Sequence, residues 1–183
     1  MKSLHDIIKY KQKRNDLIMS ENVIEAAKPE DYKDIFDLFL EIHDTLVECN
    51  PKKFKKLEGE ERENWFPKEV FDYCLDPNSH RFIDVYKIDG KIVGFVDYVV
   101  LEDPPYPGIN TWKGIFIGNI AIKKEYRRQG IGTELIHYIR DVKCPENNVT
   151  EIGLEMEAKN INALNFYKKL GMVESRIKFS MSL

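Results

Sequence analysis

The feature that most constrains this chain is an apolar strand that runs through a basic, glycine-containing turn into a helix. Residues 115–122 are mostly apolar, and the turn after them holds four basic residues, Gly130 and Gly132. An apolar residue then recurs every three or four positions up to Val142, which predicts an amphipathic helix. The first N–H groups of a helix favour negative charge, and glycine lets an anion approach the backbone. The stretch therefore predicts a binding site for a phosphate-bearing ligand.

The spacing of the glycines excludes two common phosphate-binding motifs. A dinucleotide-binding fingerprint needs a third glycine where this chain has Leu135, and a Walker loop needs a Gly-Lys-Ser/Thr sequence that the chain lacks. What remains is Arg-x-x-Gly-x-Gly, which runs from Arg127 to Gly132. On this motif alone, a strand–turn–helix corner that binds nothing stays open as an alternative.

A second stretch lies at residues 160–172 and reads Asn-x-x-Ala-x-x-Phe-Tyr-x-x-x-Gly-Met. Together with the turn, it resembles the GNAT family of N-acetyltransferases, in which phenylalanine is usual at the position of Met172. Methionine is an adaptable apolar residue, so this departure is minor. The preceding Leu154-Glu155-Met156 is similar to the Leu-Glu-Val of the N-terminal-peptide acetyltransferases of that family. The resemblance covers the chain from Val23 to the C-terminus and is firmest after residue 80.

The resemblance implies an α+β fold with a mixed, mostly antiparallel central sheet. In that family two central strands splay apart for the cofactor, and helices flank both faces of the sheet. The predicted order of elements, β-α-α-β-β-β-α-β-α-β, agrees with this architecture. We expect a helical N-terminal extension at residues 1–22 and a single acetyltransferase domain at residues 23–183, a length that suits one hydrophobic core.

Local signals predict the elements of this domain. Pro67 is expected to start or kink a helix, and Asp89-Gly90 predicts the turn of a hairpin. The proline-rich residues 102–112 are expected to form a rim of the acceptor pocket, with a plain hairpin loop as the alternative. The expected elements are an edge strand at 23–27, helices at 35–47, 60–75 and 130–144, strands at 81–88, 91–101, 114–122 and 152–157, a helix after 160, and a closing strand at 172–181.

For the cofactor, the resemblance implies acetyl-CoA. Members of the family hold the pyrophosphate of coenzyme A with the backbone amides of the glycine-containing turn, and the pantetheine arm lies between the splayed strands. The backbone of Ile120 and Ile122 would pair with the pantetheine like an added strand, and the Ile122 N–H is the candidate to hold the thioester oxygen. The expected cofactor-binding residues are Ile120, Ala121, Ile122, Arg127, Arg128, Gln129, Gly130, Ile131, Gly132, Thr133, Asn160 and Phe166.

Tyr167 is the candidate catalytic residue beside the cofactor sulfur. By resemblance its hydroxyl faces the sulfur, although an aromatic residue on a packed helix face is an alternative because Phe166 precedes it. A thiol of pKa ~8.5 is a stronger acid than a tyrosine of pKa ~10, so full proton transfer is uphill by ~2 kcal/mol. We therefore expect Tyr167 to hydrogen-bond the developing thiolate, and Asn160 to cap the helix that carries it.

Glu155 is the candidate general base, acting through water on the acceptor. An alternating strand over residues 152–157 would place Glu155 and Glu157 on one face, which indicates that this face borders a cleft. Glu155 is preferred because its spacing before Tyr167 resembles that of the base and acid in N-terminal-peptide acetyltransferases. Partial burial is expected to raise its pKa toward neutrality. Two solvated or ion-paired carboxylates remain the alternative.

The expected acceptor is a primary amine on a small molecule or a peptide. The amine must lose a proton before it attacks, and we expect direct attack within a ternary complex. Two alternatives stay open. One is a non-catalytic acyl-CoA-binding sensor module, which would bind the cofactor without turnover. The other is a different nucleotide-binding α/β enzyme, which the missing third glycine disfavours.

Charge and cysteine content limit the partners. The net charge of −3 gives no electrostatic reason to expect nucleic acid, and no apolar run approaches the ~20 residues that span a bilayer, so no membrane is expected. The 3 cysteines form no Cys-x-x-Cys pair and the 4 histidines show no metal-ligand spacing, so we expect no disulfide framework and no metal site. We expect a cytoplasmic protein that is a monomer or a homodimer.

Overall fold

One mixed sheet organises the chain, as a computed structural model shows for residues 8–9, 21–104, 107–108, 111–176 and 178. Among these residues six strands follow each other across the sheet in chain order, so that each strand lies next to its predecessor. All neighbours are antiparallel except the last pair, β5 and β6, which run parallel. The strands are β1 (Ile8–Lys9), β2 (Asn22–Ala26), β3 (Arg81–Ile88), β4 (Lys91–Glu102), β5 (Lys113–Ile122) and β6 (Glu151–Leu154).

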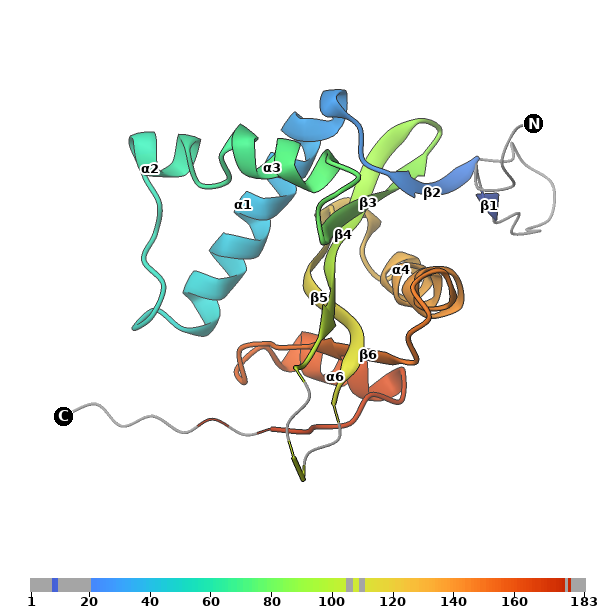
Figure 1. The fold of residues 1–183 in the computed structure, drawn as a ribbon. Helices are drawn as coiled ribbons and strands as arrows, with labels where there is room; N and C mark the ends of the chain where they lie inside the picture. The colour runs from blue at the N-terminus through green and yellow to red at the C-terminus, as the bar shows by residue number, and fades with distance from the viewer. Residues whose placement is uncertain (1–7, 10–20, 105–106, 109–110, 177, 179–183) are drawn as a thin grey trace.

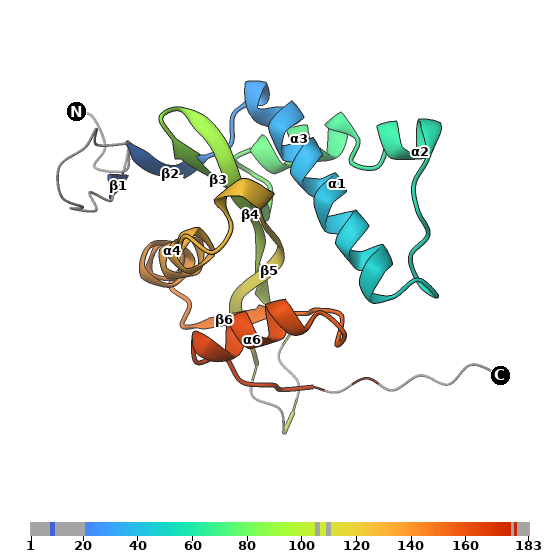
Figure 2. The same ribbon diagram turned by 180° about the vertical axis from the view of Figure 1, so that it is seen from behind.

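Helices cover both faces of the sheet, which confirms the predicted α+β architecture (Figures 1 and 2). On one face lie α1 (Tyr32–Cys49), α2 (Gly59–Glu63) and α3 (Lys68–Leu75). On the other face lies α4 (Ile131–Tyr138), which continues through a π-helical turn (Ile139–Lys143) into α5 (Cys144–Glu146). Helix α6 (Ile161–Lys169) packs on the α4 side. None of the helices in the described part of the chain is long and apolar enough to cross a membrane.

Two hydrophobic cores form because the strands alternate their side chains between the faces. On β4, Phe95 belongs to the core under α1 and α3, whereas its neighbour Val96 belongs to the core under α4. Ile35 and Leu38 of α1 are fully buried on the first side, and Leu135 of α4 on the second. The sheet is therefore buried on both faces in its middle.

Strand β5 extends beyond the end of its parallel neighbour. The pairing of β5 with β6 runs only from Gly114 to Ile117, whereas β5 continues to Ile122. A β-bulge marks the change, because Gly118 has no partner opposite it on β4. A Cβ atom at Gly118 would lie 3.1 Å from Oδ2 of Asp97, so glycine suits this position. Strands β5 and β6 separate after Ile117, as the family resemblance implies.

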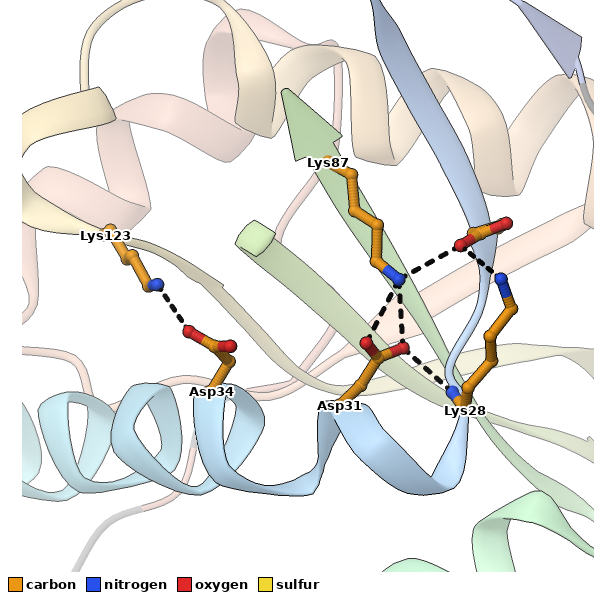
Figure 3. A network of polar contacts seen from close by, with 6 residues as sticks. Lys28, Asp31, Asp34, Lys87 and Lys123 are labelled. Atoms are coloured by element: carbon orange, nitrogen blue, oxygen red, sulfur yellow. Dashed lines mark hydrogen bonds and ion pairs between the residues drawn. The ribbon is translucent and has the colours of Figure 1, made fainter. Parts of the chain in front are cut away.

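Ion pairs attach the N-terminal part of α1 to the sheet (Figure 3). The Lys87 ammonium of β3 lies 3.0 Å from the Asp31 carboxylate, which also accepts a hydrogen bond from the Lys28 N–H. One turn further along, Asp34 pairs at 2.7 Å with Lys123, the residue that follows β5. These contacts fix α1 relative to the end of β5, where the glycine-containing turn begins.

The hairpin of β3 and β4, the long first helix and the strand before the basic turn confirm their predictions. The single helix predicted over residues 60–75 is wrong, because the chain forms α2 and α3 as separate helices. Pro67, which was expected to start or kink a helix, is extended and directly precedes α3. A helical N-terminal extension is wrong at Ile8 and Lys9, which pair with β2 as a strand; the rest of residues 1–20 lies outside the described residues.

The C-terminal strands are also shorter than predicted. Strand β6 ends at Leu154 rather than at residue 157. Residues 172–176, expected in a closing strand, form no strand, and Glu174 pairs with Lys168 of α6 at 2.9 Å instead of joining the sheet. The remainder of that predicted strand lies largely outside the described residues, as does Tyr106 of the predicted pocket rim.

Candidate active site

On the side away from β4, the end of β5 has a backbone edge that pairs with no strand among the described residues, although the Ile122 carbonyl oxygen accepts a hydrogen bond from the Arg127 side chain. The N–H of Lys123 donates a 2.8 Å hydrogen bond to the Val93 carbonyl oxygen of β4. Because successive N–H groups of a strand point to opposite sides, those of Ile120 and Ile122 point away from β4. On that side β6 has already ended at Leu154. An extended ligand could pair with this edge as an additional strand.

The N-terminus of α4 lies directly after this edge and has the geometry of an anion site. Gly130 precedes the helix with φ +93°, a left-handed conformation that favours glycine. The space around it is open, since an added Cβ would meet only Oε1 of Glu134, at 4.0 Å. The N–H groups of Ile131, Gly132 and Thr133 occupy the first helical turn, where they have no helical acceptor. Their positive ends face a negatively charged ligand favourably.

Gly132 joins three elements of the site at close range. A Cβ atom there would lie 3.2 Å from Cζ of Phe166 on α6 and 3.4 Å from Cδ1 of Ile122 on β5. The absence of a side chain therefore allows the start of α4, the end of β5 and α6 to pack together. The structure thus brings together Ile122, Gly132 and Phe166, which the sequence assigned to one site.

The two arginines of the motif face different partners. Arg127 donates through Nε to the Ile122 carbonyl oxygen at 2.8 Å and pairs with Glu41 of α1 at 2.7 Å. Its charge is thus directed toward α1. Arg128, with φ +65°, makes only a long 3.5 Å contact with Asn162 and has no ion pair within the described residues. Gln129 donates to the Glu125 carbonyl oxygen, which stabilises the turn.

Helix α6 carries Tyr167 beside Phe166, whose ring lies next to Gly132. Oδ1 of Asn160 accepts a 3.1 Å hydrogen bond from the Ala163 N–H, so the predicted cap is confirmed. Tyr167 packs beside Phe166, with 5.1 Å between the ring centroids, and belongs to the side chains around the α4 core. Burial raises the pKa of Tyr167 to about 12. Its hydroxyl makes no hydrogen bond to any described residue.

The two candidate carboxylates after β6 have different surroundings. Glu155 follows the last strand residue and is exposed, so its predicted partial burial is wrong. Glu157 accepts hydrogen bonds from Lys53 at 2.7 Å and from Asn50 at 3.0 Å. The Lys53 ammonium and the Asn50 amide lower the pKa of Glu157. The two do not share a strand face, because the strand ends before both.

One polar cluster in the sheet was not recognised in the sequence. Asp97 of β4 is 1% exposed, and its carboxylate accepts hydrogen bonds from Arg81 of β3 and from Asn119 of β5. A charged residue within the apolar run 92–100 was the available signal, since a buried carboxylate requires partners. The cluster lies beside Gly118, where β5 and β6 separate.

Comparisons with known proteins concern the family and the fold of the chain. A model of the acetyltransferase (GNAT) family matches residues 39–172. An N-alpha-acetyltransferase of Sulfurisphaera tokodaii is 31% identical over 99 residues, which cover 51% of this chain and 57% of that protein. An L-ornithine N5-acetyltransferase of Arabidopsis thaliana is 32% identical over 98 residues, or 52% of this chain and 40% of that protein. The chain thus covers less than two thirds of either relative.

Solved structures share the fold at low sequence identity. A mutant protein from Bacillus halodurans superposes with a TM-score of 0.79 at 20% identity, covering 87% of this chain and 99% of that one. An aminoglycoside N-acetyltransferase in complex with CoA superposes with a TM-score of 0.63 at 16% identity, covering 89% and 95%. Both similarities concern the fold.

Proposed function

The chain belongs to the acetyltransferase (GNAT) family, and from this premise we propose that it is an acetyl-CoA-dependent N-acetyltransferase acting on a primary amine. The observation that carries the proposal is the junction of the free β5 edge with the N-terminus of α4. A strand edge suits the amides of a pantetheine arm, and a helix N-terminus suits a pyrophosphate. Coenzyme A contains both groups in sequence.

The proposed cofactor site uses backbone groups more than charge. The N–H groups of residues 128–133 would hold the pyrophosphate, with the Arg128 side chain as the nearby cation. Arg127 has a different proposed task, because its guanidinium already bonds Ile122 and Glu41. It would hold the end of β5 in place. Ile120, Ala121 and Ile122 would line the pantetheine arm, Asn160 and Phe166 would lie beside it, and Gln129 would stabilise the turn.

The proposed chemistry needs few protein groups. Acetyl-CoA supplies an activated acetyl group and a thiol leaving group. The Ile122 N–H, directed away from β4, would stabilise the negative charge that develops on the thioester oxygen. Tyr167 would donate a hydrogen bond to the departing sulfur. We propose direct attack by the amine within a ternary complex, without a covalent intermediate on the protein.

Glu155 is proposed to accept the amine proton through water. Its exposure fits a role at the solvent-facing mouth of the site rather than within it. Glu157 suits this role less, since Lys53 and Asn50 already occupy its carboxylate. The two relatives are an N-alpha-acetyltransferase and an L-ornithine N5-acetyltransferase, which supports a peptide or a small-molecule amine as the acceptor. We also propose a reducing, cytoplasmic setting, supported by three free cysteines.

A screen of amines with acetyl-CoA tests this function. Release of free thiol would be followed with an alanine-initiated tetrapeptide, L-ornithine, spermidine and an aminoglycoside as acceptors. We expect turnover with at least one amine, and mass spectrometry should find the acetyl group on its nitrogen. Binding of coenzyme A without turnover on a broad panel would support the sensor module instead. Absence of both binding and turnover would reject the cofactor assignment.

A further inference from the structure

Asn119 lies at the point of β5 where its parallel neighbour has just ended. It pairs across the sheet with Asp97 of β4, whereas β6 pairs with β5 only as far as Ile117. Asn119 is half-buried, and Gly118 before it is exposed. The side chain therefore stands at the beginning of the free edge that we propose as the seat of the pantetheine arm.

The hydrogen bonds of Asp97 determine how the Asn119 amide is turned. The Asp97 carboxylate is buried and accepts two hydrogen bonds from the Arg81 guanidinium. Its Oδ2 also lies 2.7 Å from Nδ2 of Asn119. A carboxylate that is ionised beside an arginine only accepts hydrogen bonds, so the NH₂ end of the amide must face it. The carbonyl oxygen of Asn119 consequently faces away from β4.

The neighbours of Asn119 identify the face on which this oxygen lies. Phe95 and Ala121 alternate with the same period as Asp97 and Asn119, and both belong to the core under α1 and α3. The oxygen therefore lies on the α1 side of the sheet, at the part of β5 that runs beyond its last pair with β6. On the same side, Glu157 connects the chain after β6 to the end of α1 through Asn50. Within the described residues, the bond to Asp97 is the one hydrogen bond of the Asn119 side chain.

We infer that Oδ1 of Asn119 accepts a hydrogen bond from the amino group of the acceptor, which makes Asn119 a part of the acceptor site. The inference rests on the proposed acetyltransferase function. An amine offers N–H donors, and a carbonyl oxygen is a matching acceptor. Because Asp97 already holds the amide, little side-chain entropy is lost when the acceptor binds. Asn119 orients the amine and takes no proton, and Asp97 is a positioning residue that acts through it.

Acceptor kinetics of two Asn119 variants test this inference. Rates of thiol release would be measured against acceptor concentration for wild type, Asn119→Ala and Asn119→Ser, with the best substrate among an alanine-initiated tetrapeptide, L-ornithine and spermidine. Loss of a hydrogen bond to a charged or partly charged amine predicts an acceptor KM raised by about tenfold or more. Calorimetry should find the Kd for coenzyme A unchanged within about twofold, since the inference places Asn119 against the acceptor and not against the cofactor. The serine hydroxyl can still donate a hydrogen bond to Asp97. The Asn119→Ser variant should therefore stay folded and give a result even if Asn119→Ala does not fold.

Asn147→Ala is the matched control. Asn147 is also half-buried and loses one side-chain hydrogen bond, the 2.8 Å bond to the Lys143 carbonyl oxygen after α4. It should keep the wild-type acceptor KM. An unchanged acceptor KM in a folded Asn119 variant would overturn the inference and leave the acetyltransferase function intact. An equal loss of coenzyme A affinity would also overturn it, by moving Asn119 into the cofactor site. A wild-type protein that turns over no amine would overturn the proposed function itself, and the acceptor site with it.

Discussion

At the scale of single residues, the surroundings of Tyr167 change its expected role. With a pKa of about 12 in the fold, Tyr167 is a much weaker acid than a thiol of pKa ~8.5. Complete transfer of its proton to the thiolate would be uphill by roughly 5 kcal/mol, more than an unperturbed tyrosine requires. Tyr167 is therefore better suited to donate a hydrogen bond to the sulfur than to give up its proton. The sequence predicted the residue but not the burial that limits its acidity.

Removal of the Tyr167 hydroxyl should affect turnover and spare binding. We predict that Tyr167→Phe lowers kcat by ~10²-fold, because the departing sulfur loses its donor. The Kd for coenzyme A, measured by calorimetry, should stay within about twofold because the ring still packs beside Phe166. Tyr73→Phe, on the exposed side of α3, is the matched control. Normal turnover in Tyr167→Phe would return Tyr167 to a purely structural role.

The same substitution at the two carboxylates after β6 should have different effects on the rate. Glu155→Gln is predicted to lower kcat/KM at neutral pH, with partial recovery at high pH where more of an amine of pKa ~10.4 is already deprotonated. Glu157→Gln should change the rate much less, since its carboxylate bonds Lys53 and Asn50 rather than an open space. The measurement is a pH–rate profile of both variants. Identical profiles would mean that the base lies elsewhere or that solvent removes the proton.

At the scale of elements, the site depends on contacts between segments that are far apart in the chain. The strand, turn and start of α4 could be predicted from residues 120–135 because their signals are local. The bond between Arg127 and Glu41 could not be predicted, because the partners are 86 positions apart and the local sequence indicates a solvated charge at each. The end of β6 at Leu154 was also missed. Local alternation continues past that residue, whereas hydrogen bonds from the distant Asn50 and Lys53 hold the chain at Glu157.

Gly132 of the glycine-containing motif also has a packing role. We predict that Gly132→Ala destabilises the fold by ~1–3 kcal/mol, because its Cβ would lie 3.2 Å from the Phe166 ring. A second substitution, Phe166→Leu, should recover part of that loss by making room. Chemical denaturation of the two single variants and the double variant measures the coupling. If the changes in the free energy of unfolding are strictly additive, the Phe166 ring does not clash with the added methyl group at residue 132. A bulky residue at Gly132 therefore tests packing as well as pyrophosphate binding.

At the scale of the whole molecule, the α+β class and the covering of both faces could be predicted from the sequence. The ends of the chain could not. Short strands such as Ile8–Lys9 gain their hydrogen bonds from β2 rather than from any local pattern. The division into an extension at 1–22 and a domain at 23–183 stays a prediction, as does the choice between monomer and homodimer. The buried polar groups within the two cores could not be predicted from the hydrophobic periodicity of the sequence either.

Asp84 is one of these groups, and it should make stability depend on pH. Burial raises its pKa in the folded protein, although Lys143 lies 3.8 Å away and Tyr98 donates a hydrogen bond. A raised folded pKa gives stability that is fully present below the unfolded value of ~3.9 and is lost as the pH rises through the folded value. The ionised carboxylate therefore costs stability at neutral pH.

Asp84→Asn should remove that cost, because the neutral amide keeps an acceptor for Tyr98. We predict a higher free energy of unfolding than wild type at pH 7, and a difference that shrinks as the pH falls toward ~4. Asp37→Asn, on the exposed face of α1, is the control and should show no such trend. A variant less stable than wild type at pH 7 would show that the pair with Lys143 outweighs the burial of Asp84.

Amide hydrogen exchange with and without coenzyme A is the most direct test of the proposed site, because it reports on the backbone groups themselves. The junction of β5 with α4 predicts that coenzyme A slows exchange at Ile120, Ile122 and residues 128–133. The amides of α2 and α3 should exchange at the same rates in both states, which provides the internal control. Protection confined to other segments, or none at saturating coenzyme A, would contradict the placement of the cofactor between the free β5 edge and the N-terminus of α4.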